Sequence, residues 1–221
     1  MFSDENNKIK IILASASQRR SDILNLLKIN FEVIVPFNCI EEVFEDPYNT
    51  VIKNSIKKSE NVADYVKINE LKIPEKIKEA NYKDILICSF DTIVYFKNKY
   101  YFKPENLKEA ECFISSFSGK THSVITGLSI LSYVTGIIET GVEETKVTFR
   151  KLSEKDVQNF LMNEYVLDKA GAYNIEGYGA ILVKKINGCF FNAVGIPVYR
   201  FLNVLKKFGY DYYNLNKIKK Q

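Results

Sequence analysis

This sequence has very little histidine, and its few cysteines are not closely spaced. Its 221 residues contain a single histidine, His122, and four cysteines that stand far apart and form no C-x-x-C pair. Structural zinc sites are built from clustered Cys and His ligands, so a Cys/His zinc centre is excluded. Because no disulfide framework is indicated either, we expect a reduced intracellular chain.

Long apolar runs and a strong charge of one sign are also lacking. No apolar stretch approaches the ~18 residues of a membrane span, and the start, MFSDENNKIK, has acidic residues and no apolar signal region. The 31 Lys and Arg against 27 Asp and Glu give a net charge of only +4. We therefore expect a cytoplasmic protein with no membrane and no nucleic acid as partner, and at most a local pocket for an anion.

The glycine motifs of common nucleotide-binding folds are missing. SGKT at 118–121 lacks the glycine that a P-loop needs five residues before Gly119, where Ile114 stands, and it follows an expected helix. No G-x-G-x-x-G follows a strand. No G-x-S-x-G elbow exists, and a hydrolase triad would have to use His122 from a β-like run. His122 is therefore predicted to be structural.

Strand and helix patterns alternate along the chain, and 46% hydrophobic residues can fill a sizeable core. Strands are predicted at 9–14, 31–35, 85–102 with a KNK turn, 122–134, 144–152 and 180–184. Helices are predicted at 17–28, 50–70, from Pro104 to 117, from a capping box at 153–156, and at 197–208. No repeat or linker interrupts them, so residues 1–221 are predicted to form one α/β domain.

One carboxylate interrupts the apolar strand ICSFDTIVYF at 87–96. An unpaired carboxylate in an apolar setting costs several kcal/mol or is protonated instead, so Asp91 needs a compensating partner. The partner either only compensates the buried charge or is itself bound by the carboxylate. In both cases Asp91 is a candidate functional residue.

Three further segments place polar residues near expected strand ends. LASASQRR at 13–20 puts two arginines at a helix start, where backbone N–H groups attract anions; a Ser N-cap with solvated arginines is the alternative. FKPEN places Lys103 before a proline. LDKAGAYNIEGYGA at 167–180 strings Asp168, Lys169 and Glu176 among three glycines, which serve either a ligand or a turn.

Together, the order and spacing of these segments resemble the Maf proteins, nucleoside triphosphate pyrophosphatases related in fold to the inosine triphosphatases. LASASQRR is similar to the family's LASxSPRR, SFDTIV to (A/S)DT-V, FKP to KP, SGKTHSVITG to SG-x-HxVxTG, and DKAGAYNIEGYGA to DKAGAYxIQGxGA. With NAVGIPVYRFL, the resemblance runs from about Ile11 to Phe208. It implies a Maf-like fold, a single mixed sheet flanked by helices.

The resemblance also implies a set of site residues. Asp91 matches the proposed general base, and Glu41, the acidic residue after the second strand, implies with it a site for a divalent metal, Mg²⁺ or else Mn²⁺ or Co²⁺. The implied phosphate-binding residues are Ser15, Ser17, Arg19, Arg20, Lys58 and Lys103. The residues implied in base choice are Arg19, Thr92 and Glu176.

The implied activity is hydrolysis of the α–β phosphoanhydride bond of a nucleoside triphosphate to a monophosphate and pyrophosphate. It needs a positioned water, a base and positive charge on the leaving group, which a carboxylate, a metal and several Lys and Arg would supply. Arg19 and Thr92 agree with the dTTP/UTP-type subfamily, whereas Glu176 replaces its glutamine and Gln18 replaces the proline of the first motif. Modified nucleotides are further candidate substrates.

Two alternatives stand beside this activity. One is a 7-methyl-GTP pyrophosphatase, and the other is a non-catalytic nucleotide-binding regulator of cell division. A regulator that only binds would be expected to lose Asp91 or Lys103, and both are present. A homodimer is compatible with the resemblance.

Overall fold

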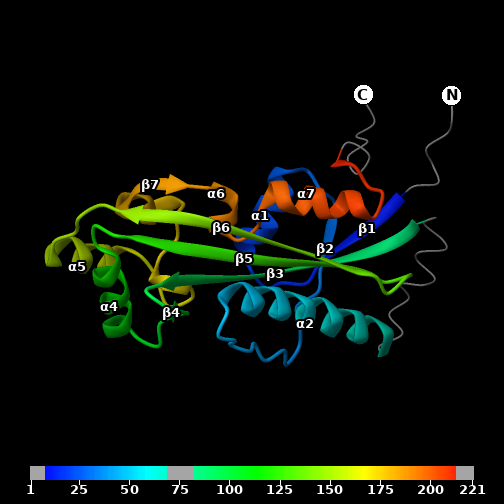
Figure 1. Ribbon diagram of the computed structural model, residues 1–221, viewed down its shortest axis with the longest axis horizontal. Helices are drawn as coiled ribbons and strands as arrows, with labels where there is room; N and C mark the ends of the chain where they lie inside the picture. The colour runs from blue at the N-terminus through cyan, green and yellow to red at the C-terminus, as the bar shows by residue number, and fades with distance from the viewer. Residues whose placement is uncertain (1–7, 69–81, 213–221) are drawn as a thin grey trace.

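The computed structural model, which describes residues 8–68 and 82–212, contains one mixed β-sheet with helices on both faces (Figure 1). The strands are β1 (Lys8–Leu13), β2 (Phe31–Val33), β3 (Tyr82–Phe96), β4 (Lys99–Tyr101), β5 (Thr121–Ser132), β6 (Ile138–Phe149) and β7 (Val183–Asn187). The helices are α1 (Gln18–Leu26), α2 (Pro47–Ile68), α4 (Leu107–Phe117), α5 (Glu154–Asn163), η2 (Ala170–Ala172), η3 (Gly177–Leu182), α6 (Phe190–Val194) and α7 (Val198–Lys207). The predicted fold class is confirmed.

The strand order is β2-β1-β3-β5-β6-β7, and β4 also pairs with β3. β1 is parallel to β2 and to β3, and every other pair is antiparallel. The long strands β3, β5 and β6 extend across the molecule, with β1 and β2 toward one end and β7 near the other (Figure 1). A functional site at the middle of these strands can therefore draw side chains from both halves.

Helix α2 covers one face of the sheet, and α1, α6 and α7 lie on the other (Figure 1). Under α2, Val62 and Val66 are one helical turn apart and pack in a cluster with Ile85 and Ile87, which are two residues apart on β3. Residues four apart on a helix, or two apart on a strand, lie on the same side of that element, so the apolar side of α2 packs against the apolar side of β3. On the opposite face, Phe90 packs edge-on against Phe201 of α7 at 5.7 Å between ring centroids.

Several helix boundaries follow from capping chemistry. The predicted capping box is confirmed: Ser153 accepts from the Asp156 N–H, and Asp156 accepts from the Ser153 N–H. The prediction of a helix start at Pro104 is wrong by three residues, because the Asn106 side chain caps α4. α2 begins at Pro47, earlier than predicted, and its predicted last residues, 69 and 70, lie outside the described residues.

Two strand predictions need correction. The strand predicted at 180–184 is wrong for its first three residues, since Gly177–Leu182 forms η3 and β7 begins at Val183. Gly177 has φ +61°, and a Cβ on Gly179 would lie 1.8 Å from the Asn174 carbonyl oxygen, so these glycines permit a tight coil instead of a strand. β6 begins at Ile138, six residues before its predicted start, because β5 offers it a partner along its whole length.

Smaller differences occur at the ends of other elements. β2 stops at Val33, two residues before its predicted end, whereas α1 and α7 match their predicted ranges to within two residues. Within the described residues, no helix is long and apolar enough to cross a membrane.

Candidate active site

The edge of β3 is interrupted near the middle of the sheet. On one side, β3 pairs with β5 continuously from Leu86 to Tyr95. On the other side, β1 ends opposite Cys88, and β4, which is antiparallel to β3, ends opposite Val94. Among the residues that the structure describes, 89–93 therefore have no strand partner on this edge, and side chains from loops and helices occupy the space.

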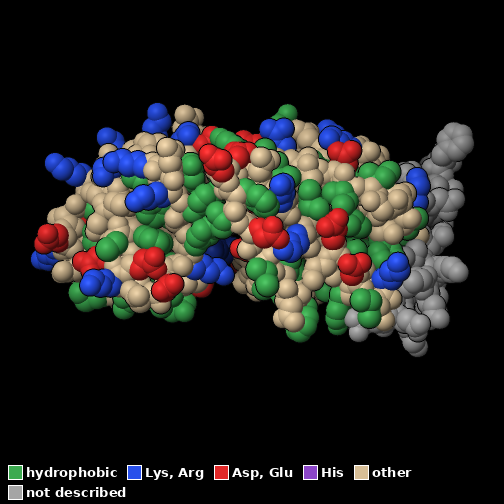
Figure 2. All heavy atoms as spheres, turned by 60° about the horizontal axis from the view of Figure 1, so that its bottom comes forward, with side chains coloured by type: hydrophobic (Ala, Val, Ile, Leu, Met, Phe, Trp, Pro, Cys, Tyr) green, Lys and Arg blue, Asp and Glu red, His purple; other side chains and the backbone are tan. Residues whose placement is uncertain are grey.

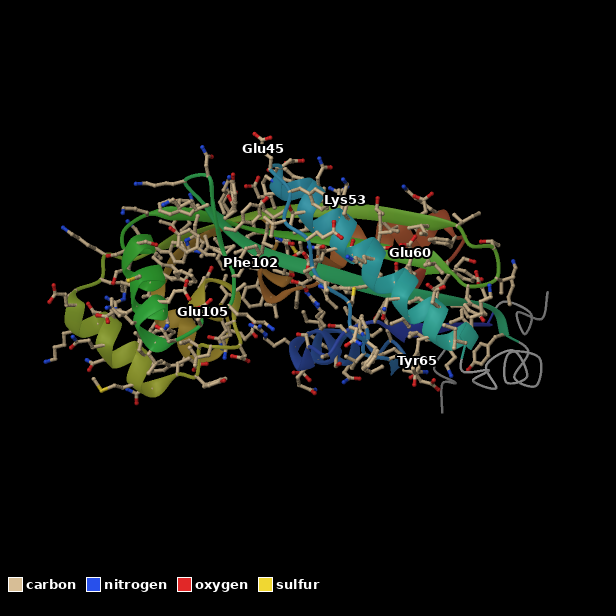
Figure 3. The ribbon with its side chains drawn as sticks, turned by 90° about the horizontal axis from the view of Figure 1, so that it is seen from below. Glu45, Lys53, Glu60, Tyr65, Phe102 and Glu105 are labelled. Atoms are coloured by element: carbon tan, nitrogen blue, oxygen red, sulfur yellow. The ribbon has the colours of Figure 1, made fainter. Side chains whose placement is uncertain are left out.

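A cavity of about 1050 Å³ adjoins this open edge. Its size is at the upper end of the range for small-molecule sites, about 300–1,000 Å³. Figure 2 shows a hollow near the middle of the face that it displays, with Lys and Arg side chains beside it. Figure 3 shows Phe102, which lines the cavity, between α4 and α2. All ten residues implicated from the sequence line it: Ser15, Ser17, Arg19, Arg20, Glu41, Lys58, Asp91, Thr92, Lys103 and Glu176.

Asp91 and Thr92 meet different helices because successive side chains of a strand point to opposite faces. Asp91, only 4% exposed, faces α2. Its Oδ1 accepts from Lys58 Nζ at 2.6 Å, and its Oδ2 accepts from Asn54 Nδ2 at 3.3 Å. The buried carboxylate therefore has a counter-charge and a second donor, both from one helix.

Lys58 connects two acidic groups. Its ammonium lies 2.6 Å from Asp91 Oδ1 and 2.6 Å from Glu41 Oε1. Burial tends to raise the pKa of Glu41, but the attraction and hydrogen bond of Lys58, with weaker attraction from Arg20 and Lys103, hold this pKa below its usual value. Both carboxylates thus converge on one point of positive charge at the cavity wall.

Arg20 is fixed on the other face of β3. Its guanidinium donates to Ser15 Oγ at 3.1 Å, to Thr92 Oγ1 at 3.1 Å and to the Gly195 carbonyl at 3.2 Å. Burial lowers the pKa of Arg20 to about 10, with attraction to Asp91 opposing the change, so the group stays charged at neutral pH. Three of its five N–H groups are used, and two remain for an anion.

The Thr92 hydroxyl has a defined direction. Thr126 Oγ1 donates to the Asn192 carbonyl at 3.1 Å, so Thr92 is the donor in the 3.0 Å hydrogen bond between the two threonines. Thr92 in turn accepts from Arg20. Toward the cavity, Thr92 therefore offers an acceptor but no donor, and it orients Arg20.

Two cations at the cavity have no direct ion-pair partner among the described residues. Within the described part of the chain, the side chains of Arg19 and Lys103 form no ion pair and no hydrogen bond, although both line the cavity. The alternative of a Ser N-cap also fails, since Ser17 stands at the N-cap of α1 without a capping hydrogen bond from its side chain. The LASASQRR segment thus presents its hydroxyls and charge to the cavity.

Glu176 lies half-buried at the same cavity, and its Oε2 is a buried oxygen without a hydrogen-bond partner among the described residues. Burial raises the pKa of Glu176, and the positive charge of Arg19 opposes this only in part. A protonated carboxyl both donates and accepts, whereas the carboxylate only accepts. An unsatisfied polar atom in a cavity indicates a position that a ligand completes.

Sequence reasoning did not assign Asn54 and Lys169 to the site. Lys169, 8% exposed, donates to Asp168 Oδ1 at 2.7 Å and to the Tyr165 carbonyl, and it lines the cavity. Asn54 is 3% exposed and lies one helical turn before Lys58. An amide at i−4 from a site lysine, on the apolar side of a helix, is the signal that could have revealed it.

A metal site can be tested against these donors. Glu41 and Asp91 point at one ammonium, so their oxygens converge, and Mg²⁺ is commonly held by one or two carboxylates together with substrate phosphates. Within residues 8–68 and 82–212, no three His, Cys, Asp or Glu side chains form a metal-binding group. The residues therefore fit a cation that shares its coordination with a phosphate ligand.

Comparisons with known proteins give a consistent result. The family model described as Maf-like protein matches residues 10–208. Proteins named dTTP/UTP pyrophosphatase are 36% identical in Caldicellulosiruptor bescii, covering 91% of this chain and 96% of that protein, and 36% identical in Carboxydothermus hydrogenoformans, covering 91% and 100%. One from Bacillus cereus is 35% identical, covering 91% and 97%.

Proposed function

Because this chain belongs to the Maf-like protein family, we propose that it is a nucleoside triphosphate pyrophosphatase acting on dTTP and UTP. It would cleave the α–β phosphoanhydride bond with water, giving a nucleoside monophosphate and pyrophosphate. The observation that carries the proposal is that a buried, paired carboxylate and two cations without a direct ion-pair partner among the described residues line one cavity of about 1050 Å³. The relatives' names set the substrate class.

Asp91 is the residue that we assign as general base. Each of its oxygens accepts one hydrogen bond, from Lys58 or from Asn54, and keeps a further lone pair for a water proton. The Lys58 ammonium, 2.6 Å from Oδ1, supplies the opposite charge beside the carboxylate that accepts the proton. The proton leaves the attacking water for the carboxylate as the water oxygen bonds to the α-phosphorus and pyrophosphate departs.

The cations would bind the triphosphate. Arg20 has two N–H groups left in a plane set by its three protein hydrogen bonds, which suits paired phosphate oxygens. Lys103 and Arg19 have no direct ion pair to break within the described residues, so a bound triphosphate would compete with their weaker attraction to Glu41 and Glu176. Ser15 and Ser17 would donate from the loop before α1, and Lys58 from the α2 side.

Glu41 and Asp91 would hold a divalent metal together with the phosphates, with Mg²⁺ the ion that this oxygen-only donor set fits best. Such a metal neutralises charge on the phosphates and on the leaving pyrophosphate. The protein's own part is to hold the two carboxylates close together at Lys58.

The test is a pyrophosphate-release assay over dTTP, UTP, the other nucleoside triphosphates and 7-methyl-GTP, with Mg²⁺, Mn²⁺ or Co²⁺. Wild-type protein should release pyrophosphate with dTTP and UTP preferred. Asp91→Asn should fold normally and turn over roughly 10² to 10⁴ times more slowly, the range for a lost general base. A folded Asp91→Asn enzyme with full metal-dependent turnover would remove Asp91 from this role.

A further inference from the structure

Asn54 occupies a buried position between the two acidic parts of the site without lining the cavity. Its side chain is 3% exposed, and it belongs to α2, the helix that also carries Lys58. Every polar atom of its amide is engaged. Nδ2 donates to the Glu42 carbonyl at 3.0 Å and to Asp91 Oδ2 at 3.3 Å, and Oδ1 accepts from the Glu42 N–H at 2.9 Å.

Asn54 and Lys58 repeat the same connection one helical turn apart. Lys58 joins Asp91 to the side chain of Glu41, and Asn54 joins Asp91 to the backbone of the next residue, Glu42. Each oxygen of Asp91 thus has its own donor from α2. The segment that carries Glu41 is a loop between β2 and α2, so its position relative to β3 depends on contacts of this kind.

The distance of α2 from the sheet is fixed by a glycine. Gly127 of β5 pairs directly with Asp91, and a Cβ at Gly127 would lie 2.4 Å from the backbone of Val51. Only glycine permits this approach of helix to strand. Val51 is one turn of α2 before Asn54 and Ser55, and the short helix-to-sheet distance lets the short Asn54 side chain reach β3.

We propose that Asn54 is a positioning residue that fixes the Glu41 loop to Asp91, so that the two carboxylates keep one separation. For the catalytic measurements this inference rests on the proposed function. Side chains that orient metal-binding or catalytic groups typically change affinity or activity by about 10–100-fold when removed. A displacement of about 1 Å in a reacting group has a similar effect.

The chain offers a matched control. Asn61, two turns further along α2, makes the same pair of backbone hydrogen bonds to this loop, accepting from the Phe37 N–H at 2.8 Å and donating to the Phe37 carbonyl at 2.9 Å. It makes no hydrogen bond to Asp91 in the described structure. Asn61→Leu therefore removes a loop anchor of equal kind without touching the carboxylate.

The experiment compares Asn54→Leu and the smaller Asn54→Ser with Asn61→Leu, using folded protein as judged by thermal unfolding. Three kinds of measurement are made: steady-state kinetics giving kcat and KM for UTP, Mn²⁺ affinity by paramagnetic resonance with a non-hydrolysable UTP analogue, and hydrogen exchange of the 39–44 amides. Both Asn54 variants should lower kcat and Mn²⁺ affinity by about 10–100-fold with a smaller change in KM, and speed exchange at Glu42. Asn61→Leu should change kcat and Mn²⁺ affinity by less than about threefold on the same scale.

The proposal is overturned if a folded Asn54 variant keeps wild-type Mn²⁺ affinity, or if Asn61→Leu reproduces its losses. If the wild-type protein releases no pyrophosphate, the proposed function fails, and Mn²⁺ affinity and Glu42 exchange still decide the role of Asn54. Unchanged Glu42 exchange in both Asn54 variants would show that the amide does not hold the loop.

Discussion

Replacing Lys58 with methionine tests how the buried carboxylate is compensated. The side chains of Lys58 and Asp91 are 12% and 6% exposed, so their 2.6 Å ion pair is largely removed from water. Taking away one partner of a buried pair costs about 3–5 kcal/mol, because the other charge stays buried. Since Asn54 remains bonded to Asp91, we expect the lower end, about 3 kcal/mol. For a chain of this length, that corresponds to a fall in Tm of about 6–12 °C.

The assay is thermal unfolding near neutral pH, at low and at high salt, with Lys57→Met as the control. Lys57 pairs with Glu42 at 2.6 Å, but the two side chains are 41% and 57% exposed, so its loss should lower Tm far less than the loss of Lys58. The deficit of Lys58→Met should persist at high salt, because a buried pair is screened little. Adding Asp91→Asn removes the uncompensated charge and should restore most of the stability.

The reasoning is refuted if Lys58→Met melts within about 2 °C of the wild-type protein, which would correspond to less than about 1 kcal/mol. It is equally refuted if the Lys58→Met, Asp91→Asn double variant is as unstable as Lys58→Met alone. Either result would mean that water, rather than Lys58, compensates Asp91.

Two further predictions concern base choice and acid stability. Glu176→Gln should shift kcat/KM toward dTTP and UTP relative to GTP and 7-methyl-GTP, because an amide can donate as well as accept; an unchanged ratio would mean that residue 176 does not read the base. Burial lowers the pKa of His122 to about 3, against about 6.5 in an unfolded chain. Below pH 6.5 the unfolded state therefore binds a proton that the folded state does not, and the free energy of unfolding falls as the pH drops toward 3. His122→Gln should therefore show a shallower dependence of unfolding free energy on pH over this range, and equal slopes would contradict the assignment.

The order of the helices and strands, and most of the residues that line the cavity, could be predicted from short segments of the sequence. Hydrophobic periodicity and capping signals are local, so β1, α1, α5 and α7 could be predicted from a few neighbouring residues. Eight of the ten residues implicated at the cavity lie in short motifs, whereas Glu41 and Lys58 were implied by the resemblance outside those motifs; all ten line one cavity. His122, predicted to be structural, is buried at 2% exposure and does not line that cavity.

Tertiary structure alone decided which edge of β3 is open and what holds Asp91 there. The gap at 89–93 depends on where two other strands, β1 and β4, end, and the early start of β6 depends on the length of β5. Neither is encoded in a local pattern, since a strand is completed by partners distant in sequence. For the same reason Asn54 could not be predicted as a site residue. In the sequence it is an ordinary position of a helix, and only the close approach of α2 at Gly127 brings its amide to Asp91 and Glu42.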